Sequence, residues 1–241
     1  MIFISMLIAA GCVSKTKEPV KIGNGNPKDL ALQYLSQNQL DEAEAAFQQA
    51  IKKDPHDTAS YIALTRLYLL RQNYTDAEDL AKQGLKVSAD DTDLKLLLAK
   101  IYALKNEKEK ASAVLKEVIE KNSKNVMAYY MLSELDSGNL SSQKNYLLKV
   151  QELAPANIVP LIALSELFAK TGKTDSSLFY LQSVKKIAPT FSGAADMAYK
   201  KSLAALQSNQ PQQATASLEQ FHELMKISPE YGTGLDEIEI P

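Results

Sequence analysis

The chain has 241 residues and a mass of 26.5 kDa, with 45% apolar and 23% charged residues, a composition that suits one large or two small folded domains. The 27 lysines and arginines nearly balance the 29 aspartates and glutamates, so the net charge is −2 and nucleic-acid binding is not expected. One cysteine and two histidines cannot assemble a Cys/His metal site, and we expect neither a metal nor another cofactor.

The chain begins with a short apolar segment, MIFISMLIAAG, which is followed by Cys12. Ile2 to Ala10 is apolar apart from Ser5, and its nine residues are too few for a membrane-spanning helix, which needs about 20. The length is typical of the core of a signal peptide. The segment resembles bacterial lipoprotein signals, in which small residues precede the cysteine that becomes lipidated.

That resemblance implies that residues 1–11 are a cleaved signal peptide and that Cys12 carries acyl chains that bind a membrane. Residues 12–26 would then be the lipid anchor and a flexible tether, because they contain Lys, Pro, Gly and Asn without a helical period. Val13 is not the Asp that retains many such proteins at the inner membrane, which favours the outer membrane, facing the periplasm, in a Gram-negative bacterium. The alternative is an uncleaved apolar N-terminus with an unmodified cysteine.

From Pro27 onward the sequence repeats with a period near 34 residues. One column recurs at intervals of 34, 34, 32, 34 and 40, at Phe47, Ala81, Leu115, Leu147, Leu181 and Phe221. An earlier column of leucines, each followed by a small residue, stands at Leu30, Leu64, Leu98, Leu132 and Leu164. Proline, which stops a helix, closes four of the units, at Pro55, Pro155, Pro189 and Pro229.

These columns resemble the tetratricopeptide repeat, most clearly in Leu30–Pro55. The resemblance implies an all-α fold, a right-handed superhelical solenoid of about six helix-turn-helix hairpins. We place the solenoid at 27–229 and its units at about 27–57, 58–91, 92–125, 126–157, 158–191 and 192–229. A C-terminal tail at 230–241 follows.

Two units depart from the period. The fourth is two residues short and has Asp136–Asn139 in place of the usual aromatic residue and turn, which predicts a shortened first helix and a local change in curvature. The sixth spans 40 residues, which predicts two lengthened helices at about Ser192–Gln207 and Gln212–Ile227.

No catalytic arrangement is predicted. Thr171–Thr174 resembles the end of a phosphate-binding loop, but Leu167 stands where that loop requires glycine and no strand precedes it, so no nucleotide is expected. His56 follows Pro55 in a turn and His222 lies on a polar helix face, and both are expected to be exposed to solvent. The sequence therefore predicts a protein that is not an enzyme.

The resemblance also implies a concave groove, lined by the first helix of each unit, that holds a protein or peptide partner. The mostly apolar set of lining positions is Lys28, Ile62, Leu96, Tyr130 and Ile162. A second set, in which the charge changes sign along the array, is Leu32, Arg66, Lys100, Glu134 and Glu166. The Lys and Asn with which some family members hold a C-terminal carboxylate are missing. The alternative is that the apolar members only pack against neighbouring helices.

The favoured interpretation is a membrane-tethered scaffold of the bacterial cell envelope that mediates protein–protein interactions, for instance in assembling a pilus, secretion or outer-membrane complex. One alternative is the N-terminal repeat module of a larger secreted or surface protein, since the apolar-polar alternation at Leu235–Ile240 is compatible with the start of a strand. Another is an unprocessed intracellular adaptor. Such assignments depend on analogy, because one repeat architecture serves many functions.

Overall fold

The computed structural model describes residues 26–226, which form twelve α-helices and no strand. The predicted signal peptide, Cys12, the tether and the tail at 230–241 lie outside the described residues. Consecutive helices pair into six hairpins: α1 (Pro27–Ser36) with α2 (Leu40–Lys53), α3 (Thr58–Leu70) with α4 (Tyr74–Val87), α5 (Thr92–Leu104) with α6 (Lys108–Lys121), α7 (Val126–Leu135) with α8 (Leu140–Leu153), α9 (Val159–Lys170) with α10 (Thr174–Ile187), and α11 (Gly193–Gln207) with α12 (Pro211–Met225). The predicted all-α repeat of about six hairpins is confirmed. None of the described helices is long and apolar enough to cross a membrane.

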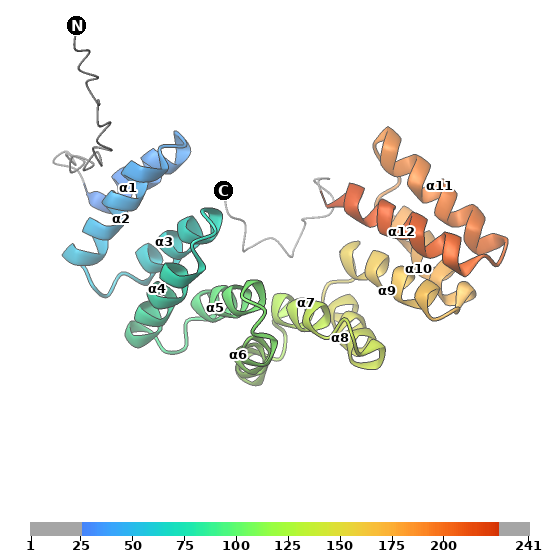
Figure 1. The fold of residues 1–241 in the computed structure, drawn as a ribbon, viewed down its shortest axis with the longest axis horizontal. Helices are drawn as coiled ribbons and strands as arrows, with labels where there is room; N and C mark the ends of the chain where they lie inside the picture. The colour runs from blue at the N-terminus through green and yellow to red at the C-terminus, as the bar shows by residue number, and fades with distance from the viewer. Residues whose placement is uncertain (1–25, 227–241) are drawn as a thin grey trace, which may run out of the picture.

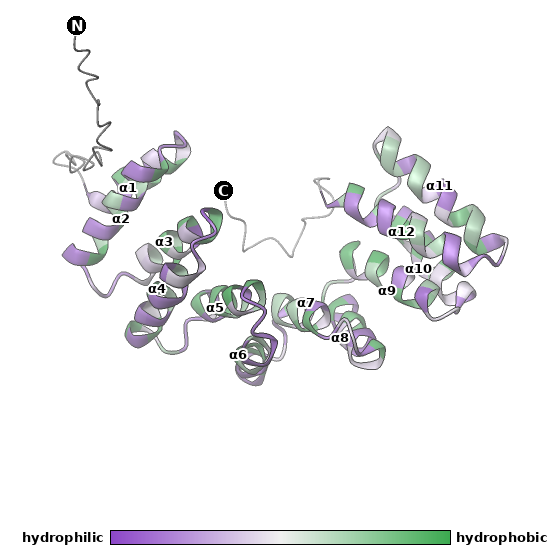
Figure 2. Cartoon of the chain, viewed as in Figure 1, coloured by the Kyte–Doolittle hydropathy of each residue, from purple (hydrophilic) through white to green (hydrophobic). Residues whose placement is uncertain are grey.

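The hairpins follow one another along an arch (Figure 1). Each second helix packs against the first helix of the next hairpin, from α2 on α3 to α10 on α11. In Figure 1, α3, α5 and α7 lie along the inner, concave side, and α4, α6 and α8 lie along the outer side. A first helix therefore has neighbours on more of its faces than a second helix. Figure 2 shows the consequence, because α5 and α7 are largely hydrophobic whereas α4 and α6 carry many hydrophilic residues.

Most of the turns inside the hairpins share one backbone conformation. Five of the six contain a residue with positive φ, at Asn38, Gln72, Asn106, Gly172 and Asn209. A left-handed residue after a helix lets the next amide turn back to the last free carbonyls of that helix. The N–H of Asn73, for example, donates to the carbonyl of Tyr68 at 2.8 Å. The predicted positions of the turns follow from this local chemistry.

The fourth hairpin is irregular, as the sequence predicts. Helix α7 has 10 residues, whereas α3 and α5 have 13 each. The turn Asp136–Asn139 has no residue with positive φ, and the Asn139 side chain instead accepts from the amides of Ser141 and Ser142 at the start of α8. On the inner side α3 contacts α5 and α5 contacts α7, but the contacts of α1 with α3 and of α7 with α9 are weaker. The inner row of helices is therefore closest from α3 to α7 and loosens after the fourth hairpin.

The sixth hairpin corrects the predicted register. Helix α12 begins at Pro211, 37 positions after α10 begins, so this unit exceeds the 34-residue period by three residues and not by six. Leu218 therefore takes the place that Phe47 has in α2, and Phe221 takes the place of Ala50. The sequence alignment was wrong here because Leu218 and Phe221 are both apolar and lie about one helical turn apart.

The last hairpin also turns inward. Helix α12, a second helix, packs against α9, whereas α11 contacts α10. Leu218, Phe221 and Met225 of α12 join a buried cluster with Ile158 and Ile162 at the start of α9. In Figure 1, α12 lies on the concave side, and its C-terminal end points toward α3 and α5. This helix therefore forms one end of the concave face.

Candidate protein-binding groove

The first half of the concave face contains an apolar hollow of about 380 Å³ between α1, α3 and the start of α5. Its walls are mostly leucine, isoleucine and alanine, with one cation and one anion: Leu32, Leu35, Ala59, Ile62, Ala63, Leu67, Leu70, Arg66 and Asp93. Ile62, Arg66 and Leu70 are four residues apart on α3 and so share one helical face. Leu32 and Leu70 remain 49% and 40% exposed. The hollow offers apolar surface that a partner would remove from water.

The middle of the concave face carries charged side chains of both signs. Lys100 on α5 lies half-buried between Arg66 on α3 and Glu134 on α7. Burial lowers the pKa of the Lys100 ammonium, the Glu134 carboxylate opposes that shift, and the Arg66 guanidinium adds to it. Charges of both signs thus meet beside the apolar hollow, because Asp93 lines it together with Arg66.

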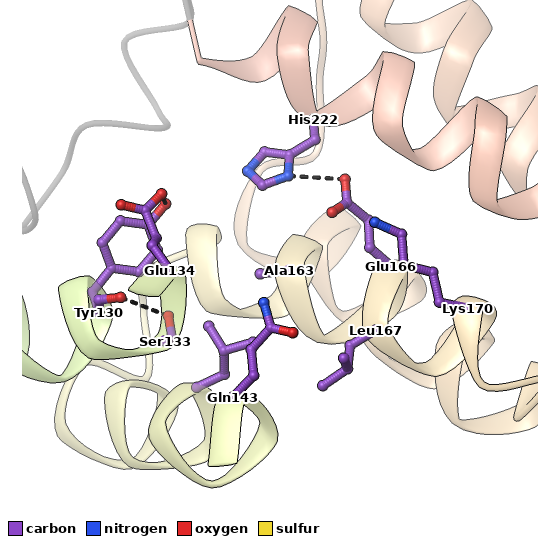
Figure 3. A pocket seen from close by; sticks show the side chains of 10 residues that line it. Tyr130, Ser133, Glu134, Gln143, Ala163, Glu166, Leu167, Lys170 and His222 are labelled. Atoms are coloured by element: carbon purple, nitrogen blue, oxygen red, sulfur yellow. Dashed lines mark hydrogen bonds and ion pairs between the residues drawn. The ribbon is translucent and has the colours of Figure 1, made fainter. Parts of the chain in front are cut away.

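The second half of the concave face contains a smaller, polar pocket of about 100 Å³ between α7, α8, α9 and α12. Figure 3 shows Tyr130 and Glu134 of α7 on one side of it and Glu166 and His222 on the other. The His222 Nδ1 lies 2.8 Å from a Glu166 carboxylate oxygen, and the Tyr130 hydroxyl donates to Glu134 at 3.2 Å. The Ser133 hydroxyl donates to the Tyr130 carbonyl at 2.6 Å.

The prediction that His222 is exposed to solvent is wrong. The side chains of His222 and Glu166 are each only 14% exposed, because α12 lies on α9. Their hydrogen bond joins the last hairpin to the fifth. His56, by contrast, is exposed as predicted. Within residues 26–226 no group of three His, Cys, Asp or Glu side chains is placed to hold a metal ion.

Two of the predicted groove residues lie in the core instead. Ile162 is fully buried beneath α12, and Leu96 is 5% exposed in a cluster with Leu115 and Leu132. For these two residues the packing alternative is correct, and they are not available to a partner. Ile62 and Tyr130, at equivalent positions, are only partly buried.

The other predicted groove residues are spread along the concave face. Leu32, Ile62 and Arg66 line the apolar hollow, and Tyr130, Glu134 and Glu166 line the polar pocket. Lys28 pairs with Asp57 at 2.9 Å at the first hairpin and does not line the hollow. Sequence reasoning missed Leu35 and Leu70 in the hollow. Leu70 follows Arg66 by four residues, so the spacing of one helical turn was the signal that would have found it.

The phosphate-loop look-alike is an ordinary turn between two helices. Gly172 has a φ of 70° between α9 and α10, and the Thr171 hydroxyl donates to the Leu167 carbonyl at 3.1 Å. Both residues therefore contribute to the end of α9.

Comparisons with known proteins agree with this architecture. A family model, Tetratricopeptide repeat, matches residues 34–101 and 69–135. No curated protein matches the sequence. Among solved structures, PilW, described as a widely conserved type IV pilus biogenesis factor, has 16% sequence identity and a TM-score of 0.66, covering 86% of this chain and 96% of that one.

Two further structures are similar at the same level. MamA from Desulfovibrio magneticus RS-1 has 14% identity and a TM-score of 0.61, covering 69% of this chain and 96% of its own. YrrB, described as a TPR protein with an unusual peptide-binding site, has 18% identity and a TM-score of 0.54, covering 76% of this chain and 94% of its own. At such identities the likeness concerns the fold alone. Residues 34–135 therefore match the tetratricopeptide repeat, and the described residues 26–226 have an all-α helical-repeat fold of the same kind as far as α12.

Proposed function

We propose that the protein is a scaffold, not an enzyme, and that it binds a partner polypeptide along the concave face. The observation that carries this proposal is the apolar hollow between α1, α3 and α5, with its exposed leucines, next to the cations Arg66 and Lys100. Complete burial of a leucine contributes roughly 1.5–3 kcal/mol, so covering the exposed parts of Leu32 and Leu70 contributes about 2 kcal/mol together. Association costs about 4–15 kcal/mol. Tight binding therefore requires further contacts along the arch.

We further propose that the scaffold is held at a bacterial membrane by acyl chains on Cys12, with the outer membrane facing the periplasm as the site in a Gram-negative cell. The apolar segment that precedes Cys12 in the sequence supports this proposal. In this location, the scaffold would help to assemble a pilus, secretion or outer-membrane complex. The likeness in fold to PilW, described as a pilus biogenesis factor, is consistent with such a role.

The groove is tested with the double variant Leu32→Ser, Leu70→Ser. Leu148→Ser is the matched control, because Leu148 is a leucine of similar exposure, 38%, on the second helix α8. Partners are captured from native envelopes by crosslinking and quantified. We expect the double variant to recover at least five-fold less partner, about 1 kcal/mol, with unchanged circular dichroism, and the control to match the unaltered chain. Equal recovery by all three chains contradicts the proposed groove.

The anchor is tested separately by metabolic labelling with a clickable fatty acid. We expect label on the unaltered chain and none on the Cys12→Ser variant. Absence of label on the unaltered chain would contradict the proposed membrane anchor and the proposed location. It would not affect the groove proposal.

A further inference from the structure

Two cavities of the concave face lie at equivalent places in the repeat. The apolar hollow lies between the first helices α1 and α3, and the polar pocket lies between the first helices α7 and α9. Leu64 of α3 and Leu164 of α9 stand in the same column of the repeat. Wall residues of the one cavity therefore correspond to wall residues of the other: Ala63 to Ala163, Leu67 to Leu167, Arg66 to Glu166 and Leu70 to Lys170.

The polar pocket is closed by a helix of the chain itself, α12. In this contact Ile162 of α9 is fully buried in one cluster with Leu218 and Phe221 of α12. The cavity that remains is about 100 Å³. An amphipathic helix therefore fits the concave surface of a first helix in this fold.

Polar residues of α12 meet polar residues of α9 along the same contact. His222 Nδ1 lies 2.8 Å from a Glu166 carboxylate oxygen (Figure 3), and the Lys170 ammonium lies 3.0 Å from the Glu219 carboxylate. The character of the covering helix thus follows that of the surface beneath it.

The apolar hollow is larger and less covered. Its volume is about 380 Å³, and Ile62, the counterpart of Ile162, is only partly buried. Among residues 26–226, the lining outside α1 and α3 consists of Asp93 at the start of α5. The concave surface of α3 therefore has room for the side chains of a further helix, whereas that of α9 is occupied by α12.

The hollow also differs from the polar pocket in chemistry. Leu70 stands where α9 has Lys170. Arg66 and Asp93 contribute one charge of each sign to the lining, so they favour neither an acidic nor a basic occupant. An occupant of the hollow must instead be apolar at the place where α12 has Glu219, because that place faces Leu70.

The walls of the hollow favour a helix over an extended segment. They are side chains of α-helices, whose backbone groups already bond within each helix, and of the described residues that line the hollow Arg66 and Asp93 are polar. An extended segment would bury backbone N–H and C=O groups without partners, whereas a helix satisfies its own. The lining runs along α3 from Ala59 to Leu70, about 16 Å or three turns, which suits a short helix.

We propose that the apolar hollow holds an amphipathic α-helix of the partner polypeptide, seated on α3 as α12 is seated on α9. Apolar residues of that helix, spaced by three and four positions as Leu218, Phe221 and Met225 are, pack on Ile62 and its neighbours. That the native partner supplies the helix rests on the proposed function, whereas the fit of a helix to α3 does not.

A synthetic peptide is the probe for this fit, and the receptor is the full chain in a Cys12→Ser background. The peptide has the sequence of residues 211–226 with two substitutions. Glu219→Leu supplies the apolar residue opposite Leu70, and His222→Gln removes a titratable side chain.

Methyl signals of the full chain are recorded by NMR as the peptide is added. We expect the signals of Ile62 and Leu70 to shift with a dissociation constant on the order of 0.1 mM, and the signal of Ile162 to stay unchanged beneath α12. Unshifted Ile62 and Leu70 signals overturn the proposal. A shift at Ile162 in their place also overturns it, because the peptide would then have displaced α12.

The helical form is tested with a second peptide that also carries Gln220→Pro. Gln220 is exposed on α12, so the apolar face is kept while proline disfavours the helix. We expect binding at least about ten-fold weaker than that of a matched Gln220→Ala peptide. Equal binding of the two peptides overturns the helical occupant in favour of an extended one.

The seat on α3 is tested by exchanging one contact. The unaltered chain should bind the Glu219→Leu peptide about five-fold more tightly than a peptide that keeps Glu219. In the variant Leu70→Lys, which has the residue of α9 at this place, we expect the opposite order. An order that Leu70→Lys leaves unchanged overturns the assigned position of the helix.

These measurements contain no native partner, so they fail separately from the proposed function. Loss of crosslinked partner in the Leu32→Ser, Leu70→Ser variant, combined with equal binding of the proline and alanine peptides, keeps the groove and overturns its helical occupant. Peptide binding combined with unchanged partner recovery keeps the fit of a helix to α3 and overturns its use by the partner.

Discussion

Gln72 occupies a backbone conformation that most residues avoid. Its φ of 57°, in the turn between α3 and α4, is matched at the equivalent position of other hairpins by Asn or Gly. The left-handed conformation costs a residue with an ordinary side chain roughly 1–2 kcal/mol, and Asn and Gly tolerate it best. The chain thus accepts a local cost at Gln72 so that α3 can end and α4 can pack back against it.

We predict that Gly172→Ala, where φ is 70°, lowers the free energy of unfolding by about 1 kcal/mol, and that Gln72→Gly raises it by about 0.5–1 kcal/mol. Gly138→Ala is the control. A Cβ at Gly138, as at Gly172, meets no atom within 4 Å, but Gly138 does not have a positive φ. Urea unfolding measures all three. Equal effects of the two Gly→Ala changes would show that the backbone conformation is not the cause.

Gly84 is required for a different reason, which is space. A Cβ on this residue of α4 would lie 2.8 Å from Leu94 Cδ1 and 3.0 Å from the Tyr61 Cβ. Leu94 is fully buried, so it has little room to move. We predict that Gly84→Ala lowers the free energy of unfolding by about 1 kcal/mol, because overpacking exceeds the gain in helix propensity.

A double-mutant cycle tests whether the contact with Leu94 causes this loss of stability. Adding Leu94→Ala should make Gly84→Ala neutral or favourable, because the truncated side chain frees the space that the new methyl group needs. The free energies come from urea unfolding of the four proteins. A coupling energy near zero between the two sites would contradict the steric explanation.

At the scale of the helices, ion pairs recur where one hairpin meets the next. Arg71, which follows α3, pairs with Asp41 at 2.6 Å and with Glu44 of α2. Lys105, which follows α5, pairs in the same way with Glu78 of α4. Glu78 has the same place in α4 that Glu44 has in α2. The first two junctions between hairpins therefore combine apolar packing with an ionic contact.

We predict that Glu78 makes the junction of α4 and α5 sensitive to acid. Hydrogen bonds from Lys105 and Lys82 lower the pKa of the Glu78 carboxyl, and Glu78 is only 8% exposed. A lowered pKa stabilises the fold above about pH 4.5, and this stabilisation is lost as the pH falls through the folded-state pKa. Glu78→Gln should therefore cost about 1–2 kcal/mol at pH 7 and less as the pH falls below 4.5.

The measurement for Glu78 is urea unfolding of both chains between pH 7 and pH 3. Asp79→Asn is a suitable control, because Asp79 is the exposed neighbour on α4. A difference between the unaltered chain and Glu78→Gln that stays constant across this range would contradict the assignment of the acid sensitivity to Glu78.

At the scale of the whole molecule, the regular contacts of the described arch are interrupted at the fourth hairpin. The ion pair of the earlier junctions is missing there. Asp136 stands after α7, where Arg71 and Lys105 follow the earlier helices, and Ser112 of α6 has the position of Glu44 and Glu78. A hollow of about 510 Å³ lies between α6 and the end of α7. The buried residues of α8 are divided between two small clusters, around Leu147 and around Val150.

We predict that native-state hydrogen exchange is faster in α7 and α8 than in α5 and α9. In a repeat protein each hairpin is stabilised by its neighbours, and segments with few buried contacts open first. The ratio of exchange rates should fall when Ser112→Glu and Asp136→Arg restore the ion pair of the earlier junctions. Protection in α7 and α8 equal to that in α5 would contradict this account.

The sequence by itself determined the repeat, the number of hairpins and the positions of most turns. These depend on residues that lie close together in the chain, such as the apolar columns, the helix-ending prolines and turn residues like Gly172, and each hairpin contacts mainly its neighbours. The shortened α7 was predictable for the same reason, because Asp136–Asn139 is a local change in turn chemistry.

Only the tertiary structure decided where α12 lies. Its packing on α9 joins the second helix of one hairpin to the first helix of the preceding one, and no spacing in the sequence specifies that contact. Ile162 is buried and His222 is shielded from solvent for this reason. The apolar hollow has a similar origin. Leu32 and Leu70 are ordinary helix residues in the sequence, and the way α1, α3 and α5 curve leaves them uncovered on the concave face.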